Sequence, residues 1–122
     1  MGLCIYVAGK WELKARVREV QNMLQQCGHV ITHDWTKHEA GDFRRDSIID
    51  LRAVADADVF VGIFEEDVPY AGALCELGAA LALGKPCYIL GNAPITERCI
   101  FFYHPHIRRG ELPFMRDLLG VR

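Results

Sequence analysis

The chain has 122 residues, of which 51% are hydrophobic and 25% charged, and its formal net charge is -2 at pH 7. These values predict one globular domain over residues 1–122 and argue against a nucleic acid polymer as partner. We also expect a cytoplasmic protein without a membrane span, because the start shows no secretion signal and the longest apolar stretch, 71–83, is shorter than the roughly 20 residues that cross a bilayer.

Strand-like and helix-like patterns alternate along the chain. Continuous apolar runs predict buried strands, and apolar residues that recur every three or four positions predict helices. Gly28 and Gly84 follow two of the helices as stop signals. In chain order, the predicted elements are strand 3–8, helix 14–26, strand 29–33, helix 46–57, strand 59–64, helix 71–83, strand 87–90, strand 99–103 and helix 112–119.

This alternation predicts an α/β fold with right-handed crossovers. We expect a doubly wound, flavodoxin- or Rossmann-like three-layer sandwich around a mainly parallel five-stranded sheet. In such folds ligands bind beyond the carboxyl ends of the strands, where the strand order reverses. The loops to examine for function are therefore 9–12, 33–38, 65–72 and 91–96.

Glu76 is the only charged residue in the apolar stretch 71–83. A carboxylate on a buried helix must find hydrogen-bond donors, rise in pKa or face a cavity, and such groups are common in active sites. The small residues Gly72, Ala73 and Gly78 would let a ligand approach the helix closely. A structural role is the alternative, in which Glu76 caps its own helix or pairs with an arginine across a subunit interface.

Three segments of the chain resemble the nucleoside 2-deoxyribosyltransferase family, which includes deoxynucleoside 5'-monophosphate N-glycosidases. Residues 5–11 (Ile-Tyr-Val-Ala-Gly-Lys-Trp) resemble its first strand and glycine turn, and 57–61 (Ala-Asp-Val-Phe-Val) its central strand. The strongest match is 72–86, a glycine-led helix with Glu-Leu-Gly followed by Gly-Lys-Pro. Together the segments cover most of residues 3–91.

The resemblance implies cleavage of the N-glycosidic bond of a nucleoside or nucleoside 5'-monophosphate. Glu76 would attack the anomeric carbon, and the sugar would pass to another base or to water, a chemistry that suits carboxylates. A second acid would act on the leaving base, and Asp67 is the candidate, with Glu66 behind it. The family's acid lies nearer its glutamate than Asp67 does, and Tyr70 would fill part of that place.

Further roles follow from the resemblance to the family's first strand. Tyr6 matches a tyrosine that lies beside the nucleophile, so it would hold the carboxylate of Glu76. Gly9, Lys10 and Trp11 form a turn whose N–H groups and ammonium could bind a sugar hydroxyl or a 5'-phosphate. A core tyrosine, a surface lysine and a packed tryptophan are the structural alternatives.

The remaining candidates concern the base and the assembly. Asp34, at the end of the second strand, is a candidate for contact with the base. Family members complete each site with a residue from a neighbouring subunit, so the resemblance implies a homo-oligomer, a dimer or higher, with shared active sites. Asn92 lies in a loop from which such a residue could come.

We expect neither a cofactor nor a metal site. The five cysteines form no Cys-x-x-Cys pair, and a regular strand or helix would not direct His33, Asp34 and His38 at one ion. The turn after the first strand is neither a Walker loop nor a dinucleotide fingerprint. The alternative function is a non-catalytic nucleotide-binding or sensing module, in which the same cleft binds a nucleotide and Glu76 is structural.

Overall fold

A computed structural model of the chain describes residues 2–38 and 41–121. Within these residues, five strands form one sheet in the order β2-β1-β3-β4-β5, and every neighbouring pair is parallel. The predicted doubly wound sheet is therefore confirmed, and it is entirely rather than mainly parallel. The strands are β1 (Cys4–Ala8), β2 (Val30–Ile31), β3 (Val59–Ile63), β4 (Cys87–Leu90) and β5 (Ile107–Arg109).

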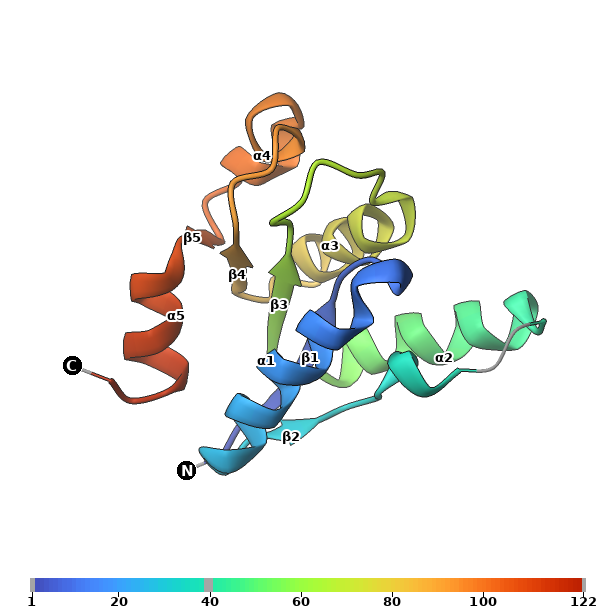
Figure 1. Ribbon diagram of the computed structural model, residues 1–122, viewed down its shortest axis with the longest axis horizontal. Helices are drawn as coiled ribbons and strands as arrows, with labels where there is room; N and C mark the ends of the chain where they lie inside the picture. The colour runs from blue at the N-terminus through green and yellow to red at the C-terminus, as the bar shows by residue number, and fades with distance from the viewer. Residues whose placement is uncertain (1, 39–40, 122) are drawn as a thin grey trace.

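Helices cover both faces of the sheet, as Figure 1 shows, with α1 and α5 on one face and α2 and α3 on the other. None of the helices in the described part of the chain is long and apolar enough to cross a bilayer. Their bounds are α1 (Lys14–Gln26), α2 (Phe43–Asp56), α3 (Ala71–Ala82), α4 (Ile95–Arg98) and α5 (Glu111–Leu118), with short 3-10 helices η1 (Trp11–Leu13), η2 (Trp35–Lys37) and η3 (Ile100–Tyr103).

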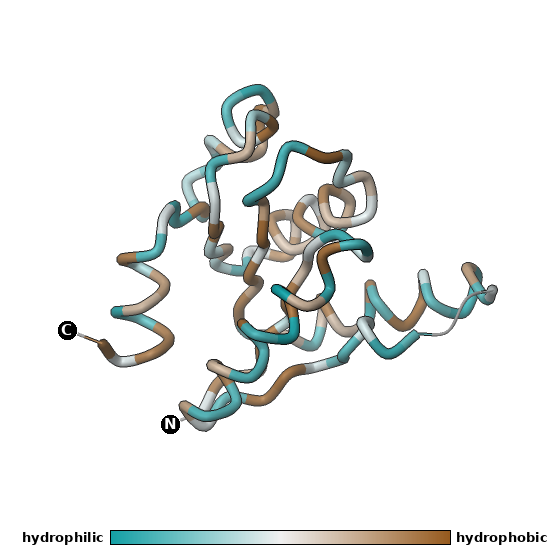
Figure 2. Tube along the Cα trace, viewed as in Figure 1, coloured by the Kyte–Doolittle hydropathy of each residue, from teal (hydrophilic) through white to brown (hydrophobic). Residues whose placement is uncertain are grey.

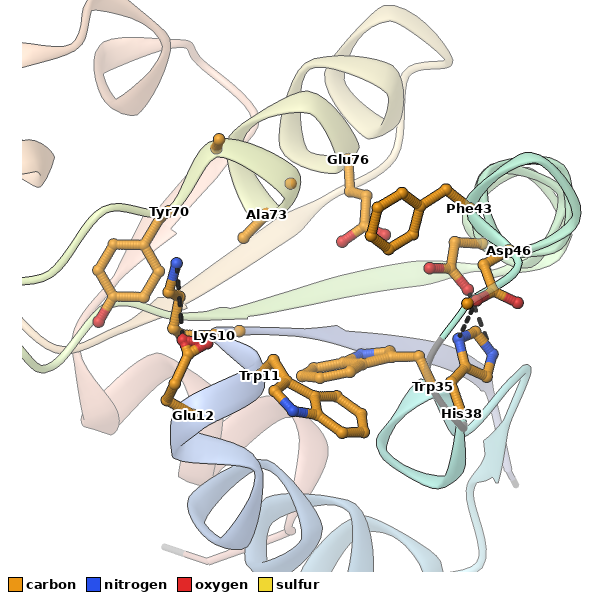
Figure 3. A pocket seen from close by; sticks show the side chains of 15 residues that line it. Lys10, Trp11, Glu12, Trp35, His38, Phe43, Asp46, Tyr70, Ala73 and Glu76 are labelled. Carbon is orange, nitrogen blue, oxygen red and sulfur yellow. Dashed lines mark ion pairs between the residues drawn. The ribbon is translucent and has the colours of Figure 1, made fainter.

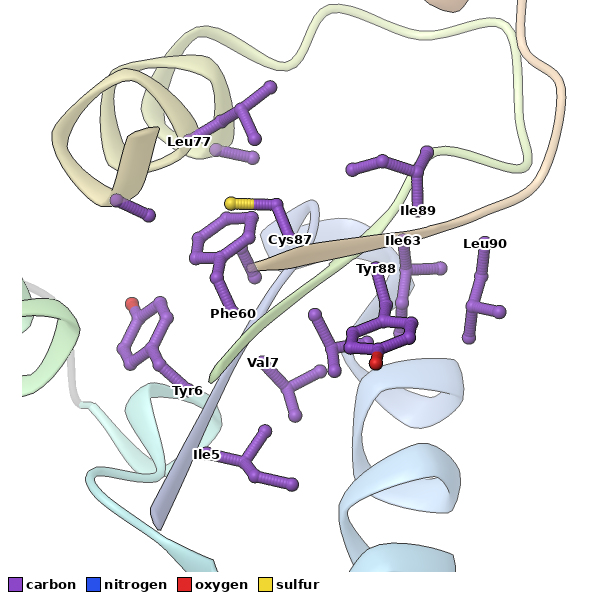
Figure 4. Packing of buried hydrophobic residues seen from close by; sticks show 14 of the residues in the cluster. Ile5, Tyr6, Val7, Phe60, Ile63, Leu77, Cys87, Tyr88, Ile89 and Leu90 are labelled. Atoms are coloured by element: carbon purple, nitrogen blue, oxygen red, sulfur yellow. The ribbon is translucent and has the colours of Figure 1, made fainter. Parts of the chain in front are cut away.

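Alternate residues of the strands build two apolar layers. Tyr6, Phe60 and Cys87 point to the side of Leu77 on α3, while Val7 and Tyr88 point to the opposite side of the sheet (Figure 4). All five strand residues are buried, as expected for a parallel sheet covered on both faces. The helices differ in polarity: α1 is mainly hydrophilic apart from its inner side, whereas α3 is almost wholly apolar (Figure 2).

The prediction of a fifth strand at 99–103 is wrong. Residues 100–103 form η3, and the fifth strand is β5, further along the chain. Only Phe102 of the apolar run Ile-Phe-Phe-Tyr is buried, against Phe64 with ring centroids 5.0 Å apart. The strand at the sheet edge carries Arg108 and Arg109, so its sequence lacks the apolar run on which the prediction relied.

Two other elements differ from their predicted ranges by more than one residue at one end. The second strand is limited to two residues, and α2 begins at Phe43 rather than at residue 46. The earlier start follows from a helix cap, because the side chain of Asp42 accepts a hydrogen bond from the N–H of Arg45. This additional turn brings Phe43 to the site described next.

The strand order reverses between β1 and β3. The chain leaves β1 toward β2 on one side, whereas β3 continues toward β4 on the other. At such a point the loops after the two strands diverge and leave room for a ligand.

Candidate functional site

A cavity of about 520 Å³ lies at the carboxyl ends of β1 and β3, within the range of about 300–1,000 Å³ typical of small-molecule sites. Four segments form its wall: the turn after β1, the loop around η2, the first half of α2, and the start of α3 (Figure 3). The lining side chains that carry polar or aromatic groups are Lys10, Trp11, Glu12, Trp35, His38, Phe43, Asp46, Asp50, Tyr70 and Glu76.

Glu76 reaches the cavity from the second turn of α3. Its Oε2 accepts a hydrogen bond of 2.7 Å from the hydroxyl of Tyr6. Burial raises the pKa of Glu76 to about 7, the bond from Tyr6 lowers it, and the charge of Asp50 raises it. The carboxyl group therefore titrates near neutral pH.

Tyr6 is fully buried on β1, and its hydroxyl group supports the carboxyl group of Glu76 through this hydrogen bond. Burial, reinforced by the negative charges of Glu76 and Asp50, raises its pKa far above the usual value. Its ring stacks on Phe60 with centroids 6.2 Å apart. Tyr6 thus stays protonated and donates to one oxygen of Glu76, and it lies behind that side chain rather than in the cavity wall.

Asp46 and Asp50 bring two more carboxyl groups to the cavity. Their spacing of four residues places them on the same face of α2. Burial raises the pKa of Asp50, while the neighbouring His38 and His33 lower it. Sequence reasoning missed both aspartates, although two acids four residues apart on the inner face of a helix next to a ligand loop were a usable signal.

The turn after β1 forms the floor of one end of the cavity. Gly9 is packed so closely that a Cβ atom there would lie 2.7 Å from Cγ2 of Val17. Lys10 lines the cavity, and its Nζ lies 3.8 Å from Oε2 of Glu12. Trp11 is 43% exposed at the rim. The predicted residues Gly9, Lys10 and Trp11 therefore all line the cavity.

The start of α3 supplies Tyr70 and Gly72 to the wall, as predicted. The Tyr70 ring is buried, and its hydroxyl donates a bond of 2.9 Å to the backbone carbonyl of Glu66, which closes the acidic loop. A Cβ atom built on Gly72 would meet open space, so this glycine leaves the helix backbone accessible from the cavity.

Besides Tyr6, four predicted residues lie outside the cavity wall. Asp67 and Glu66 are exposed on the loop after β3, and Asn92 is exposed after β4. Asp34 caps η2 by accepting a hydrogen bond from the N–H of Thr36. Hydrogen bonds of this kind bring its pKa below the usual value, against the opposing effect of burial.

His33 and His38 lie on either side of η2, and their side chains meet. Their Nε2 atoms lie 2.5 Å apart, and Oδ1 of Asp50 lies 4.0 Å from the first and 3.8 Å from the second. The carboxylate beside the two imidazoles thus comes from α2 and not from Asp34. Sequence spacing could not reveal this partner, since folding brings it from another segment.

Comparisons with known proteins identify the family and the fold. Residues 5–100 match the model of the nucleoside 2-deoxyribosyltransferase family, whereas no curated protein matches the sequence. A 2-deoxyribosyltransferase from Bacillus psychrosaccharolyticus superposes with a TM-score of 0.61 at 26% identity, over 75% of this chain and 74% of its own.

A CMP N-glycosidase from Clostridium botulinum has the same fold, with a TM-score of 0.65 at 19% identity over 87% of this chain and 85% of its own. The family match covers the cavity, Tyr6 and Glu76. On this evidence, the chain belongs to the nucleoside 2-deoxyribosyltransferase family.

Proposed function

We propose that the protein cleaves the N-glycosidic bond of a nucleoside or nucleoside 5'-monophosphate, with Glu76 as the nucleophile. The observation that carries this proposal is the pairing of Glu76 with Tyr6 at the wall of a cavity large enough for a nucleoside. Membership of the family supports the reaction class, and transferases and an N-glycosidase both occur among proteins of this fold.

The hydrogen bond from Tyr6 distinguishes the two oxygens of Glu76. Oε2 is held by the tyrosine, which leaves Oε1 to attack C1' of the sugar. As the C1'–O bond forms, the C1'–N bond breaks and the base departs with its electron pair. Water or a second base then attacks C1', which releases Glu76 and completes hydrolysis or transfer.

A second carboxyl group is needed where the base departs. Asp67 was the sequence candidate, but Asp50 lines the same cavity as Glu76 while Asp67 is exposed outside its wall. We therefore assign to Asp50 the hydrogen bond to the leaving base and to Asp67 at most an indirect role.

The end of the cavity that contains Lys10 is suited to bind the 5' position of the sugar. Lys10 offers an ammonium group there, and the neighbouring Gly72 leaves the N-terminal turn of α3 open, where backbone N–H groups attract anions. These features favour a nucleoside 5'-monophosphate over the free nucleoside. Trp11 is the candidate for stacking on the base.

An oligomer with shared sites is part of the same proposal. On α2, Phe43, Ile48 and Leu51 are exposed apolar side chains, and Phe43 also lines the cavity. A second copy that covers this face would shield the apolar surface and close the cavity on one side. Asn92 is exposed and away from the cavity wall, so it would act only in the site of a neighbouring subunit.

The test is base release from a panel of deoxynucleosides and their 5'-monophosphates, followed by chromatography with and without an acceptor base. Release that is lost in Glu76→Gln and retained in Glu65→Gln supports the proposal, and dependence on an acceptor identifies a transferase. If the folded protein binds nucleotides but releases no base from any substrate, the sensing module is the better description. Light scattering measures the number of subunits in wild type and in Ile48→Glu, which places a charge among the exposed apolar side chains of α2.

A further inference from the structure

Three side chains that commonly bind metals meet at the edge of the cavity. They are His33 after β2, His38 after η2 and Asp50 on α2, and their ligand atoms all lie within 4.8 Å of one another. His38 and Asp50 also line the cavity. In Figure 3, His38 lies beside Asp46 at the opposite end of the cavity from Lys10.

The distances between the donor atoms are close to those around a small ion. Donors 2.0–2.1 Å from a tetrahedral zinc ion are about 3.3 Å from one another. Here the Nε2 atoms of His33 and His38 are 2.5 Å apart, and Oδ1 of Asp50 is 4.0 and 3.8 Å from them. Movements of under about 1 Å would bring all three donors to equal distances from one centre.

The chemistry of the group also fits an ion. Oδ1 of Asp50 is buried, and among the described residues it has no hydrogen-bond donor. The other ring nitrogen of His38, Nδ1, lies 3.6 Å from Oδ2 of Asp46. In metal sites, the imidazole nitrogen that does not bind the metal commonly contacts a carboxylate, which orients the ring.

The loop that carries the histidines is held in place independently of them. The indole N–H of Trp35 donates a bond of 2.7 Å to the carbonyl of Val7 on β1, and Arg18 donates to the hydroxyl and the carbonyl of Thr36, both at 2.9 Å. The histidines before and after this segment are thereby directed toward α2. Such anchoring reduces the ordering required when a ligand binds.

We propose that His33, His38 and Asp50 form a binding site for one divalent transition-metal ion such as Zn²⁺, with a further coordination position open toward the cavity. Two imidazoles and one carboxylate are a donor set that suits Zn²⁺ and Co²⁺ and is poorly matched to Mg²⁺ or Ca²⁺. The proposal concerns ion binding alone and holds whether or not Glu76 is a nucleophile. An ion bound to Asp50 would compete with the role proposed above for this carboxyl group toward the leaving base. Among the described residues, the two imidazoles share one hydrogen bond and Oδ1 of Asp50 accepts none.

The experiment is titration of EDTA-treated, dialysed protein with ZnCl2 by calorimetry and with CoCl2 by visible absorption. We expect one ion per chain and the absorption bands of low-coordinate Co²⁺. His33→Ala, His38→Ala and Asp50→Asn should each weaken Zn²⁺ binding at least about tenfold, and Asp46→Asn about tenfold. Circular dichroism of each variant verifies folding, and Zn²⁺ should raise the Tm of wild type but not of His38→Ala.

The matched control is the other histidine pair of the chain. His104 and His106 lie with ring centroids 4.9 Å apart, close to the 4.7 Å of His33 and His38, but no carboxylate groups with them in the described residues. The double variant His104→Ala/His106→Ala should bind Zn²⁺ as wild type does. Absence of Zn²⁺ binding, binding that survives His38→Ala in the folded protein, or binding lost in the control variant would each overturn the proposal.

Discussion

Two groups of acidic residues in this chain, one in the loop after β3 and one at the cavity, have opposite properties. The loop after β3 has three consecutive acids, of which Glu66 and Asp67 are exposed and Glu65 forms an ion pair of 2.9 Å with Arg16. The cavity instead has carboxyl groups that are far apart in sequence, among them Glu76 and Asp50, and burial raises the pKa of both.

The difference shows that clustering in sequence does not indicate which acids this fold brings to the cavity. Solvent and a guanidinium group stabilise the charges of the loop, so those acids have little tendency to react. Partial removal from water raises the pKa of a carboxyl group toward neutral pH. Such a group can bind and release a proton, or attack a carbon atom in its ionised form. Four predictions separate the two regions.

The strongest contrast is expected between Glu76→Gln and Glu65→Gln. Loss of the proposed nucleophile should reduce kcat for base release at least about 10³-fold, since the amide cannot form the sugar ester. Glu65→Gln should stay within about threefold, because its ion pair with Arg16 is partly exposed and lies outside the cavity wall. Steady-state chromatographic assays measure both, and equal losses would remove the distinction.

Asp50→Asn compared with Asp67→Asn tests which acid meets the base. We expect a loss in kcat of about 10²-fold for Asp50→Asn, since it lines the cavity with Glu76, and a change of under about threefold for Asp67→Asn. Metal-free buffer with EDTA keeps ion binding out of the comparison. A larger effect of Asp67→Asn would restore the exposed loop as part of the site.

The pH dependence of stability should distinguish the partly buried carboxyl group of Glu76 from the exposed ones. The folded-state pKa of Glu76 is raised from 4.5 to about 7, so the folded protein binds its proton more tightly than the unfolded chain does. Its contribution to stability is therefore fully present below about pH 4.5 and is lost as the pH rises through 7. Urea unfolding with EDTA should show that wild type loses on the order of 2 kcal/mol relative to Glu76→Gln between pH 5 and 8. The free energy of unfolding of Glu65→Gln should change with pH as that of wild type does. Parallel curves of this free energy against pH for all three proteins would contradict the partial burial of Glu76.

Tyr6→Phe tests a positioning residue. The tyrosine hydrogen bond favours the ionised form of Glu76, so its removal should raise the pKa of Glu76 further. We expect kcat/KM to rise with pH through about 7 in wild type and at higher pH in the variant, with a loss of about tenfold at neutral pH. A merely structural role would lower activity equally at every pH.

The sequence predicted the fold well wherever burial produces a pattern. The bounds of α1 and β4 agree with the predicted ranges, and Glu76 stood out as a candidate because a charge in an almost wholly apolar helix has few structural explanations. The edge strand β5 was missed, since an edge strand needs no continuous apolar run and this one carries two arginines.

The polar part of the site was less predictable, because its contacts join distant segments. Asp50 lies 26 residues from Glu76 along the chain and 12 from His38, and no local spacing relates the three. The predicted residues Gly9, Lys10, Trp11, Tyr70 and Gly72 do line the cavity, because they follow strands whose carboxyl ends parallel topology brings to one edge of the sheet.

The aromatic wall of the cavity also makes the site visible to spectroscopy. The chain has two tryptophans, Trp11 and Trp35, and both line the cavity with ring centroids 6.4 Å apart. All intrinsic tryptophan emission of the protein therefore originates at the site. A nucleobase that stacks on Trp11 would quench the emission of this partly exposed ring, while Trp35, buried and bonded to Val7, would supply a steady background. Occupancy can thus be followed by fluorescence in the unmodified protein, without a label and without turnover.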